Sequence, residues 1–168
     1  MKAARKTPRR GRKSWREKLA VDNGLPKVMA LTGPQAAKWG GVSMVVPAPR
    51  EVDSLIRQVP AGRVATIAEL RAALARRHGT EVACPITTGI FAWIAAHAAV
   101  EAAAAGEPAP TPWWRVLKTG GELNPKYPGG APEQSRLLAA EGHRFKPSRG
   151  ARPPRVADWE KVLHTEFL

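Results

Sequence analysis

The segment 86–105 constrains the fold of this chain more than any other, because it carries a single charged side chain, Glu101. Alanine, the best helix former, dominates it, and Gly106 follows where helices commonly end on glycine. Its most apolar part, 90–105, includes His97 and Glu101 and is shorter than a membrane-spanning helix needs to be. We therefore expect a long helix inside a folded domain rather than a membrane span.

Three further helices are predicted by apolar periodicity and by end signals. They are expected at Glu51–Gln58, from Thr66 to His78, and at Glu133–Glu141. Thr66 and Glu69 form the clearest of these signals, a T-x-x-E capping box that satisfies free amides at a helix start. Short strand-like runs at 42–46 and 114–117 add little to this helical content, so we predict a mainly α fold.

The length of 168 residues suffices for one domain with a hydrophobic core, plus tails. We divide it into a basic, largely irregular N-terminal arm at 1–41, a domain at 42–145, and a basic linker with a C-terminal helix at 146–168. Within the arm, Trp15 stands out among charged residues. It is expected either to anchor the arm on the domain or to stack on a base.

The charge of the chain points to a polyanionic partner. Lys and Arg total 27 against 14 acidic residues, which gives a net charge of +13. Such an excess attracts nucleic acid, with DNA as the first candidate and RNA as the second. The cations gather in residues 1–18 and in 143–155. An anionic membrane surface, or basic tails without a specific target, are the alternatives; we expect no membrane partner.

Cys84 is the only cysteine, so the chain can form neither an internal disulfide nor a Cys/His zinc site. We expect no metal and no cofactor, and a reducing, cytoplasmic location in association with the nucleoid. Cys84 lies before Pro85 at a predicted helix start, a place that can activate a thiol. Free cysteines are more commonly buried, and we favour that interpretation.

Five short motifs occur in sequence along the central region. They are VPAGRVAT at 59–66, PWWRV at 112–116, GGEL at 120–123, GG at 129–130 and LLAAEG at 137–142. Together they resemble the DNA-binding domain of the O6-alkylguanine-DNA alkyltransferases, the methylated-DNA–protein-cysteine methyltransferases. The resemblance implies a winged helix-turn-helix domain that binds the minor groove and flips a damaged base.

The chain departs from this family at both reactive positions of its Pro-Cys-His-Arg-Val motif. Trp113 stands at the position of the nucleophilic Cys and Trp114 at that of the His, while Glu141 matches the Glu that orients the His. An indole has no thiolate to accept an alkyl group, so we expect no transfer reaction. Glu141 is left with nothing to orient and is interpreted as a structural residue.

The resemblance is therefore to the alkyltransferase-like branch, which also carries Trp for Cys. Those proteins bind alkylated DNA without repairing it and pass it to other repair proteins, although they usually keep the His. The family's base-rotating Tyr falls near Ile67 here, and its intercalating Arg falls around 86–88, where no Arg is present. Ile86 or a neighbouring Thr could still act as a small wedge.

The residues expected to contact nucleic acid combine the family's positions with the basic arm. They are Arg63, Thr66, Thr87, Thr88, Trp113, Trp114, Arg115, Tyr127, Arg9, Arg10 and Arg12. Two interpretations of the indole pair stay open. Either the indoles stack on a base, or they fill the space left by the lost active site.

Four functions follow from these observations. The first is a non-catalytic, alkyltransferase-like DNA-binding protein that recognises alkylated bases and is linked to DNA repair. The second is a general nucleic-acid or nucleoid-associated binder without lesion recognition, whose affinity is carried by 1–18 and 144–155. The third is a protein-interaction module that uses the apolar face of 86–105, and the fourth is an enzyme that uses Cys84.

Overall fold

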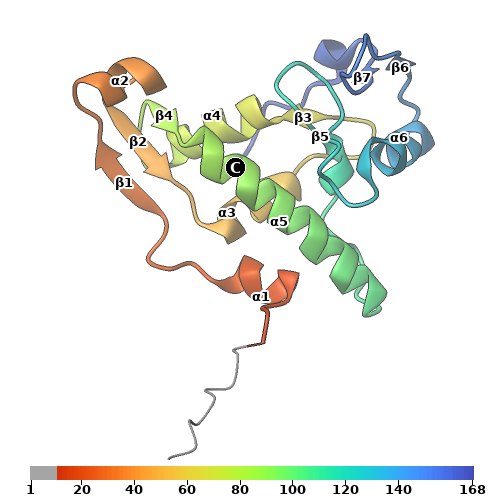
Figure 1. Cartoon of the computed structure of the whole chain (residues 1–168), viewed down its shortest axis with the longest axis horizontal. Coiled ribbons are helices and arrows are strands. Elements are labelled where there is room, and N and C mark those ends of the chain that lie inside the picture. Colours follow the sequence, from red (N-terminus) through yellow and green to blue (C-terminus); the bar gives the residue numbers. More distant parts are fainter. Residues whose placement is uncertain (1–10) are drawn as a thin grey trace, which may run out of the picture.

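The computed structural model describes residues 11–168, and its elements are arranged around one long helix (Figure 1). This helix, α5 (Pro85–Ala104), contacts α1 (Trp15–Ala20), α3 (Pro49–Ile56) and α4 (Ile67–His78). The remaining helical elements are α2 (Pro34–Trp39), α6 (Gly130–Ala140) and the 3-10 turns η1 (Trp113–Arg115) and η2 (Trp159–Val162). The strands are β1 (Lys27–Ala30), β2 (Ser43–Val46), β3 (Ala65–Thr66), β4 (Val82–Ala83), β5 (Val116–Leu117), β6 (Phe145–Lys146) and β7 (Arg155–Val156). The mainly α fold is confirmed.

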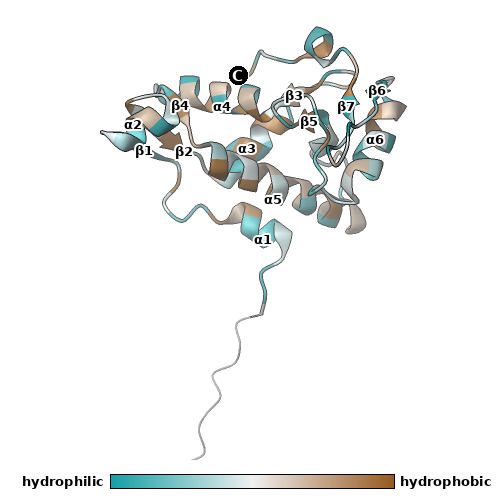
Figure 2. Ribbon diagram, turned by 45° about the horizontal axis from the view of Figure 1, so that its top comes forward, coloured by the Kyte–Doolittle hydropathy of each residue, from teal (hydrophilic) through white to brown (hydrophobic). Residues whose placement is uncertain are grey.

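α5 confirms the long helix predicted over 86–105, with Pro85 at its first turn. It has 20 residues and a mean hydropathy of 1.3, which by length and composition would suit a membrane span. The stretch 90–105, which was expected to be too short to cross a membrane, is therefore part of a helix that is long enough to do so. Core helices of globular proteins meet the same criterion, and α5 packs against three other helices. Figure 2 shows its hydrophobic residues concentrated toward the N-terminal half.

α4, the connection 79–84 and α5 form the predicted helix-turn-helix. The capping box at the start of α4 is confirmed, because Thr66 accepts a hydrogen bond from the amide of Ala68 and Glu69 accepts one from the amide of Thr66. Gly79 ends the helix at a φ of +64°, a left-handed conformation that glycine adopts without strain. The parallel pair β3–β5 lies against the start of α4.

The N-terminal region is more ordered than expected. β1 pairs antiparallel with β2, and β2 pairs parallel with β4, so Lys27–Ala30 forms the edge strand of a three-stranded sheet. The irregular arm predicted over 1–41 is therefore wrong for most of its described part. One side of this sheet packs in a buried cluster that includes Leu31, Met44 and Val82. The apolar pattern of the segment was not recognised in the sequence because Gly, Pro and Lys residues surround it.

Trp15 anchors α1 on α5. Its ring stacks on His97 with centroids 4.4 Å apart and meets Trp93 edge-on at 4.7 Å. Its backbone amide donates a 3.0 Å hydrogen bond to Glu101. Burial lowers the pKa of His97, although a hydrogen bond with the backbone of Lys126 opposes this shift, so the stacked imidazole is neutral at pH 7. Aromatic contacts of this kind hold α1 against α5.

The helix expected at the C-terminus does not form. β6 pairs antiparallel with β7, and the residues after η2 run beside β3. The amide of Val64 donates to the carbonyl of Val162, and the amide of His164 donates to the carbonyl of Val64. These backbone groups are used between segments, so they are not available for a helix.

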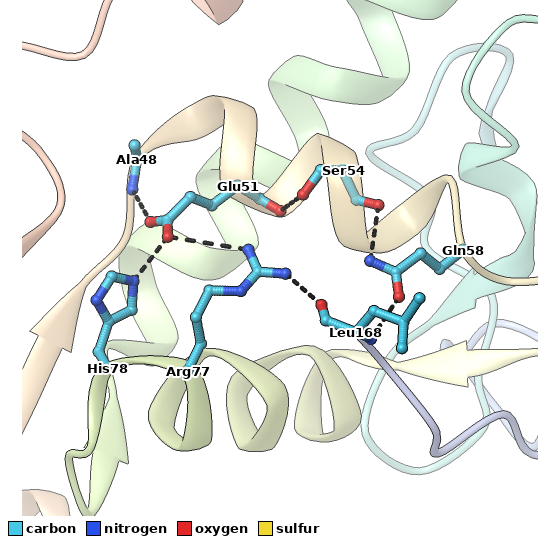
Figure 3. Close-up of polar contacts among 7 residues, drawn as sticks. All are labelled: Ala48, Glu51, Ser54, Gln58, Arg77, His78 and Leu168. Atoms are coloured by element: carbon cyan, nitrogen blue, oxygen red, sulfur yellow. Dashed lines mark hydrogen bonds and ion pairs between the residues drawn. The ribbon is translucent and has the colours of Figure 1, made fainter.

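A polar cluster ties the end of the chain to α3 and α4 (Figure 3). The carboxylate of Glu51 lies 2.6 Å from Nε2 of His78 and 3.9 Å from Nη1 of Arg77. Arg77 also donates to the carbonyl of Leu168 at 2.7 Å, and the amide of Leu168 donates to Gln58. The helix pair and the C-terminal segment are thereby held as one unit.

The close approach of Trp159 to Gly121 gives a test of the C-terminal packing. Gly121 has a φ of +81°, and a Cβ there would collide with the Trp159 indole, whereas a Cβ on Gly120 would meet no atom within 4 Å. We expect Gly121→Ala to lower the free energy of unfolding by about 2 kcal/mol or more. Gly120→Ala is the control and should change it little. Equal stability of the two variants in urea denaturation would contradict this packing.

Candidate nucleic-acid interface

The PWWRV motif forms a tight turn between the long helix and the small β3–β5 pair. Residues 113–115 make the 3-10 turn η1, which contacts both α5 and α6. Val116 then enters β5, where it lies opposite Ala65 of β3. The turn therefore contacts α5 and α6 and continues into the strand that pairs with β3.

Trp113 fills the position at which the resembling family has its reactive cysteine. Its side chain is 4% exposed and packs with Ala96 and Ala99 of α5. Its ring meets Tyr127 edge-on at 5.7 Å and Trp114 edge-on at 5.9 Å. Of the two interpretations left open for this indole, the structure supports filling rather than stacking on a base.

Glu141 organises the rest of the motif. Its carboxylate accepts hydrogen bonds from Nε1 of Trp114 at 2.9 Å, from Nη2 of Arg115 at 2.7 Å and from the amide of Gly62 at 3.2 Å. Arg115 also donates to the carbonyl of Val59 at 2.7 Å. The expectation that Glu141 has nothing to orient was wrong: the indole N–H takes the place of an imidazole N–H as its donor.

The charge state of Glu141 follows from these contacts. Burial favours the neutral acid, but the hydrogen bonds from Arg115, Trp114 and Gly62 outweigh it and lower the pKa of this carboxyl below its usual 4.5. His143 lies close by, and burial lowers its pKa in spite of the attraction of Glu141. At neutral pH the cluster therefore holds one carboxylate against one guanidinium, with a neutral imidazole beside them.

Four residues predicted to contact nucleic acid are buried, which corrects that assignment. Thr66, Thr88, Trp113 and Tyr127 are each at most 4% exposed. Thr66 is used in the capping box, and the hydroxyl of Thr88 donates to the carbonyl of Cys84 at 2.7 Å. Burial also raises the pKa of the Tyr127 phenol, which stays neutral. These side chains shape the site from within.

The other predicted contacts differ in their placement. Arg9 and Arg10 lie outside the described residues, while Arg12 and Arg63 are exposed. Thr87, Trp114 and Arg115 are partly buried, and the latter two are held by Glu141. The exposed arginines remain the ones best able to reach a phosphate.

An open groove lies on the outer face of α5. We call it the α5 groove; its volume is about 510 Å³, and it is lined by Ile86, Gly89, Ile90, Trp93, Lys118, Asn124, Pro125 and Lys126. Ile86 is 58% exposed and Ile90 is 45% exposed, which is unusual for large apolar side chains on a helix this well packed. Nε1 of Trp93 donates to the carbonyl of Lys126 at 3.0 Å and holds the opposite wall in place.

Sequence reasoning named only Ile86 among the residues that line this groove. Trp93 both contacts the Trp113 cluster and lines the groove. The available signal was the spacing of Ile86, Gly89 and Ile90, which places two apolar side chains on one helical face with a gap between them. Lys118 carries no such signal, since its place depends on how the loop after β5 folds back.

Cys84 is buried and packs with Leu31, Met44 and Val82 in an apolar cluster. Across residues 11–168, no group of three His, Cys, Asp or Glu side chains is close enough to bind a metal ion. The chemistry of the site therefore rests on aromatic, apolar and basic side chains.

Removing the Glu141 charge tests the cluster. We expect Glu141→Gln to lower the free energy of unfolding by about 2 kcal/mol at neutral pH, because a hydrogen-bonded charge is lost. The folded pKa lies below the unfolded one, so this stabilisation is present above pH 4.5 and is lost as the pH falls through the folded value. Urea denaturation at pH 7 and near pH 3 measures both effects. Glu160→Gln, at an exposed position with no ion pair among residues 11–168, is the control; a pH-independent difference for Glu141→Gln would contradict the ion pair.

Comparison with known proteins agrees with this architecture. The family model described as "6-O-methylguanine DNA methyltransferase, DNA binding domain" matches residues 47–143, more than half of the chain. No curated protein sequence matches. Two solved structures are similar, each at 18% identity and a TM-score of 0.49, covering 70% of this chain and 94% of theirs. They are S. pombe Atl1 with damaged DNA containing O6-carboxymethylguanine, and S. pombe ATL with DNA. The chain belongs to the family of 6-O-methylguanine DNA methyltransferase DNA-binding domains.

Proposed function

We propose that this protein binds DNA without modifying it and that it holds an alkylated base in the α5 groove. The observation that carries the proposal is the contrast between two neighbouring places. Trp113 closes the position of the family's acceptor cysteine, whereas the groove on the outer face of α5 is open. Binding is therefore separated from transfer within one domain.

The loss of transfer chemistry follows from the side chains at the motif. Alkyl transfer needs a thiolate and a base that deprotonates it. Trp113 supplies neither a thiol nor space for one, and Trp114 commits its N–H to Glu141. Cys84, the alternative nucleophile, is buried in a separate cluster and is not proposed as an acceptor.

The α5 groove suits a base that has left the DNA stack. Its volume falls within the range of small-ligand sites, about 300–1,000 Å³. Ile86, Ile90 and Trp93 give it apolar and aromatic surface, on which a flipped base gains stacking of about 1–3 kcal/mol. Lys118 and Lys126 stand at the same groove, where they can neutralise the flanking phosphates.

Ile86 is the residue we propose as the wedge. It lies in the first turn of α5, it is exposed, and apolar side chains can enter a base step in the minor groove. It would replace the intercalating arginine that the resembling family places in this stretch. We also propose RNA and other repair proteins as partners. Both proposals depend on the α5 groove being a binding site.

A second function, general nucleic-acid binding without lesion recognition, is favoured by one observation. Ile67 lies near the position expected for the family's base-rotating tyrosine and packs against the core, so the usual aid to base flipping is missing. The two functions differ in one measurable quantity. Lesion recognition requires a preference for alkylated duplex, and general binding does not.

Fluorescence anisotropy with matched duplexes that contain O6-methylguanine or guanine measures that preference. We expect tighter binding to the alkylated duplex, and we expect Ile86→Ala to weaken it about tenfold, or about 1.4 kcal/mol, because apolar contact with the opened base step is lost. Val28→Ala removes a side chain of similar exposure, 54%, from β1 and should leave affinity unchanged.

Two outcomes would contradict the proposal. Equal affinity of the wild-type protein for both duplexes removes lesion recognition and leaves the general binder. Transfer of a labelled methyl group from the duplex to the protein removes the non-catalytic assignment, and its loss in Cys84→Ser would identify that thiol as the acceptor.

A further inference from the structure

The residues that follow the family match, 144–168, carry six lysines and arginines, and four of these lie in one hairpin. We call 145–156 the basic hairpin; it consists of β6, β7 and the loop between them. Its four cations, Lys146, Arg149, Arg152 and Arg155, are all exposed. Figure 1 shows the basic hairpin beside α6, at the opposite end of the molecule from β1 and α2.

The four cations surround a single hollow of about 590 Å³. Glu122 is the only carboxylate that lines it, and it lies 3.9 Å from Arg152. Within residues 11–168, no carboxylate comes within 4.0 Å of the other three cations. Like charges held around one hollow repel each other unless an anion enters it, and the size of this hollow suits a stretch of backbone better than a single ion.

The hairpin is fixed to the turn that borders the α5 groove. The amide of Leu123 donates to the carbonyl of Pro154 at 2.9 Å, and the amide of Val156 donates to the carbonyl of Gly121 at 3.1 Å. Lys118, at the start of the same turn, lines the α5 groove. One short turn therefore separates the groove from the hollow, and the position of each relative to the other is set by backbone hydrogen bonds.

We infer that the basic hairpin binds the phosphodiester backbone of the same nucleic acid whose base occupies the α5 groove. This inference rests on the proposed function and adds a second contact to it. α5 has no lysine or arginine, so cationic contacts to phosphates must come from other elements, as Lys118 and Lys126 do at the α5 groove. The hairpin adds cationic phosphate contacts from outside the family domain, so the protein covers a longer stretch of the duplex.

The exposed surface of the hairpin favours nucleic acid over a lipid surface. Its two large apolar residues, Phe145 and Val156, pack into a core cluster with Leu138. A segment that lies in a membrane interface presents apolar side chains beside its cations, and this hairpin does not. The binding energy available to it is therefore electrostatic.

The test compares two triple variants that lose the same charge. The hairpin variant removes the unpaired hairpin cations by Lys146→Gln, Arg149→Gln and Arg155→Gln. The control variant removes exposed cations of β1, α2 and α4 by Lys27→Gln, Lys38→Gln and Arg76→Gln. Each phosphate contact contributes about 0.9 to the slope of log K against log salt. We expect the hairpin variant to lose about 2–3 units of slope on a duplex of roughly two helical turns, and less on one of roughly one turn. We expect the control variant to keep the wild-type slope.

Each outcome bears on a different claim. If both variants lose the same slope, or if neither loses any, the basic hairpin is not a specific backbone contact and the inference is wrong. In that case, a preference of both variants for the O6-methylguanine duplex would still support the proposed function. If the wild-type protein binds no duplex, the proposed function itself fails. Loss of binding to phosphatidylserine vesicles by the hairpin variant, with duplex binding unchanged, would assign the hairpin to membranes instead. Circular dichroism establishes that both variants are folded.

Discussion

One carboxylate, Glu141, determines how the rest of the site is arranged. It stands just past the end of α6 and joins that helix to the motif turn through Trp114 and Arg115, and to the loop before β3 through Gly62. Without this charge, three segments that are distant in sequence would have no common partner. The hydrogen bonds also explain why a motif that has lost its cysteine and histidine keeps a defined shape.

The two tryptophans of the motif have different roles. Trp114 substitutes for a histidine as a hydrogen-bond donor, so it preserves the structural half of the original pair. Trp113 places a large side chain at the position of the nucleophile. It packs there against Tyr127 and the alanines of α5, so the position is part of the core. The open surface that remains is the α5 groove, bounded on one side by Trp93.

The exposed cations and the apolar α5 groove lie on different elements of this molecule. α5 carries apolar side chains and no lysine or arginine, while exposed arginines and lysines lie on the basic hairpin and near the start of α1. Trp15 fixes the start of α1 to α5, and backbone hydrogen bonds fix the hairpin to the turn after β5. Sequence-independent affinity can thus come from the flanks, and any selectivity from the groove.

Much of the fold was predictable because its signals are local. The capping box at Thr66, the glycine stop at Gly79 and the run 86–105 each specify a helix through neighbouring residues. The sheet of β1, β2 and β4 was missed because its strands are short and join segments far apart in the chain. The same reason applies to the site: the family motifs located Trp113, but the partners of Glu141 and the walls of the α5 groove depend on loops that no local pattern places.

In the proposed complex, a bound lesion occupies the α5 groove and leaves the packed motif undisturbed. The chain has six tryptophans, and their indole N–H signals can be followed by 15N NMR after assignment with single Trp→Phe variants. On titration with an O6-methylguanine duplex, we expect a large shift for the indole signal of Trp93 and small shifts for those of Trp113 and Trp114. A large shift of Trp114, with Trp93 unchanged, would show that the base enters the old active site and would contradict the account.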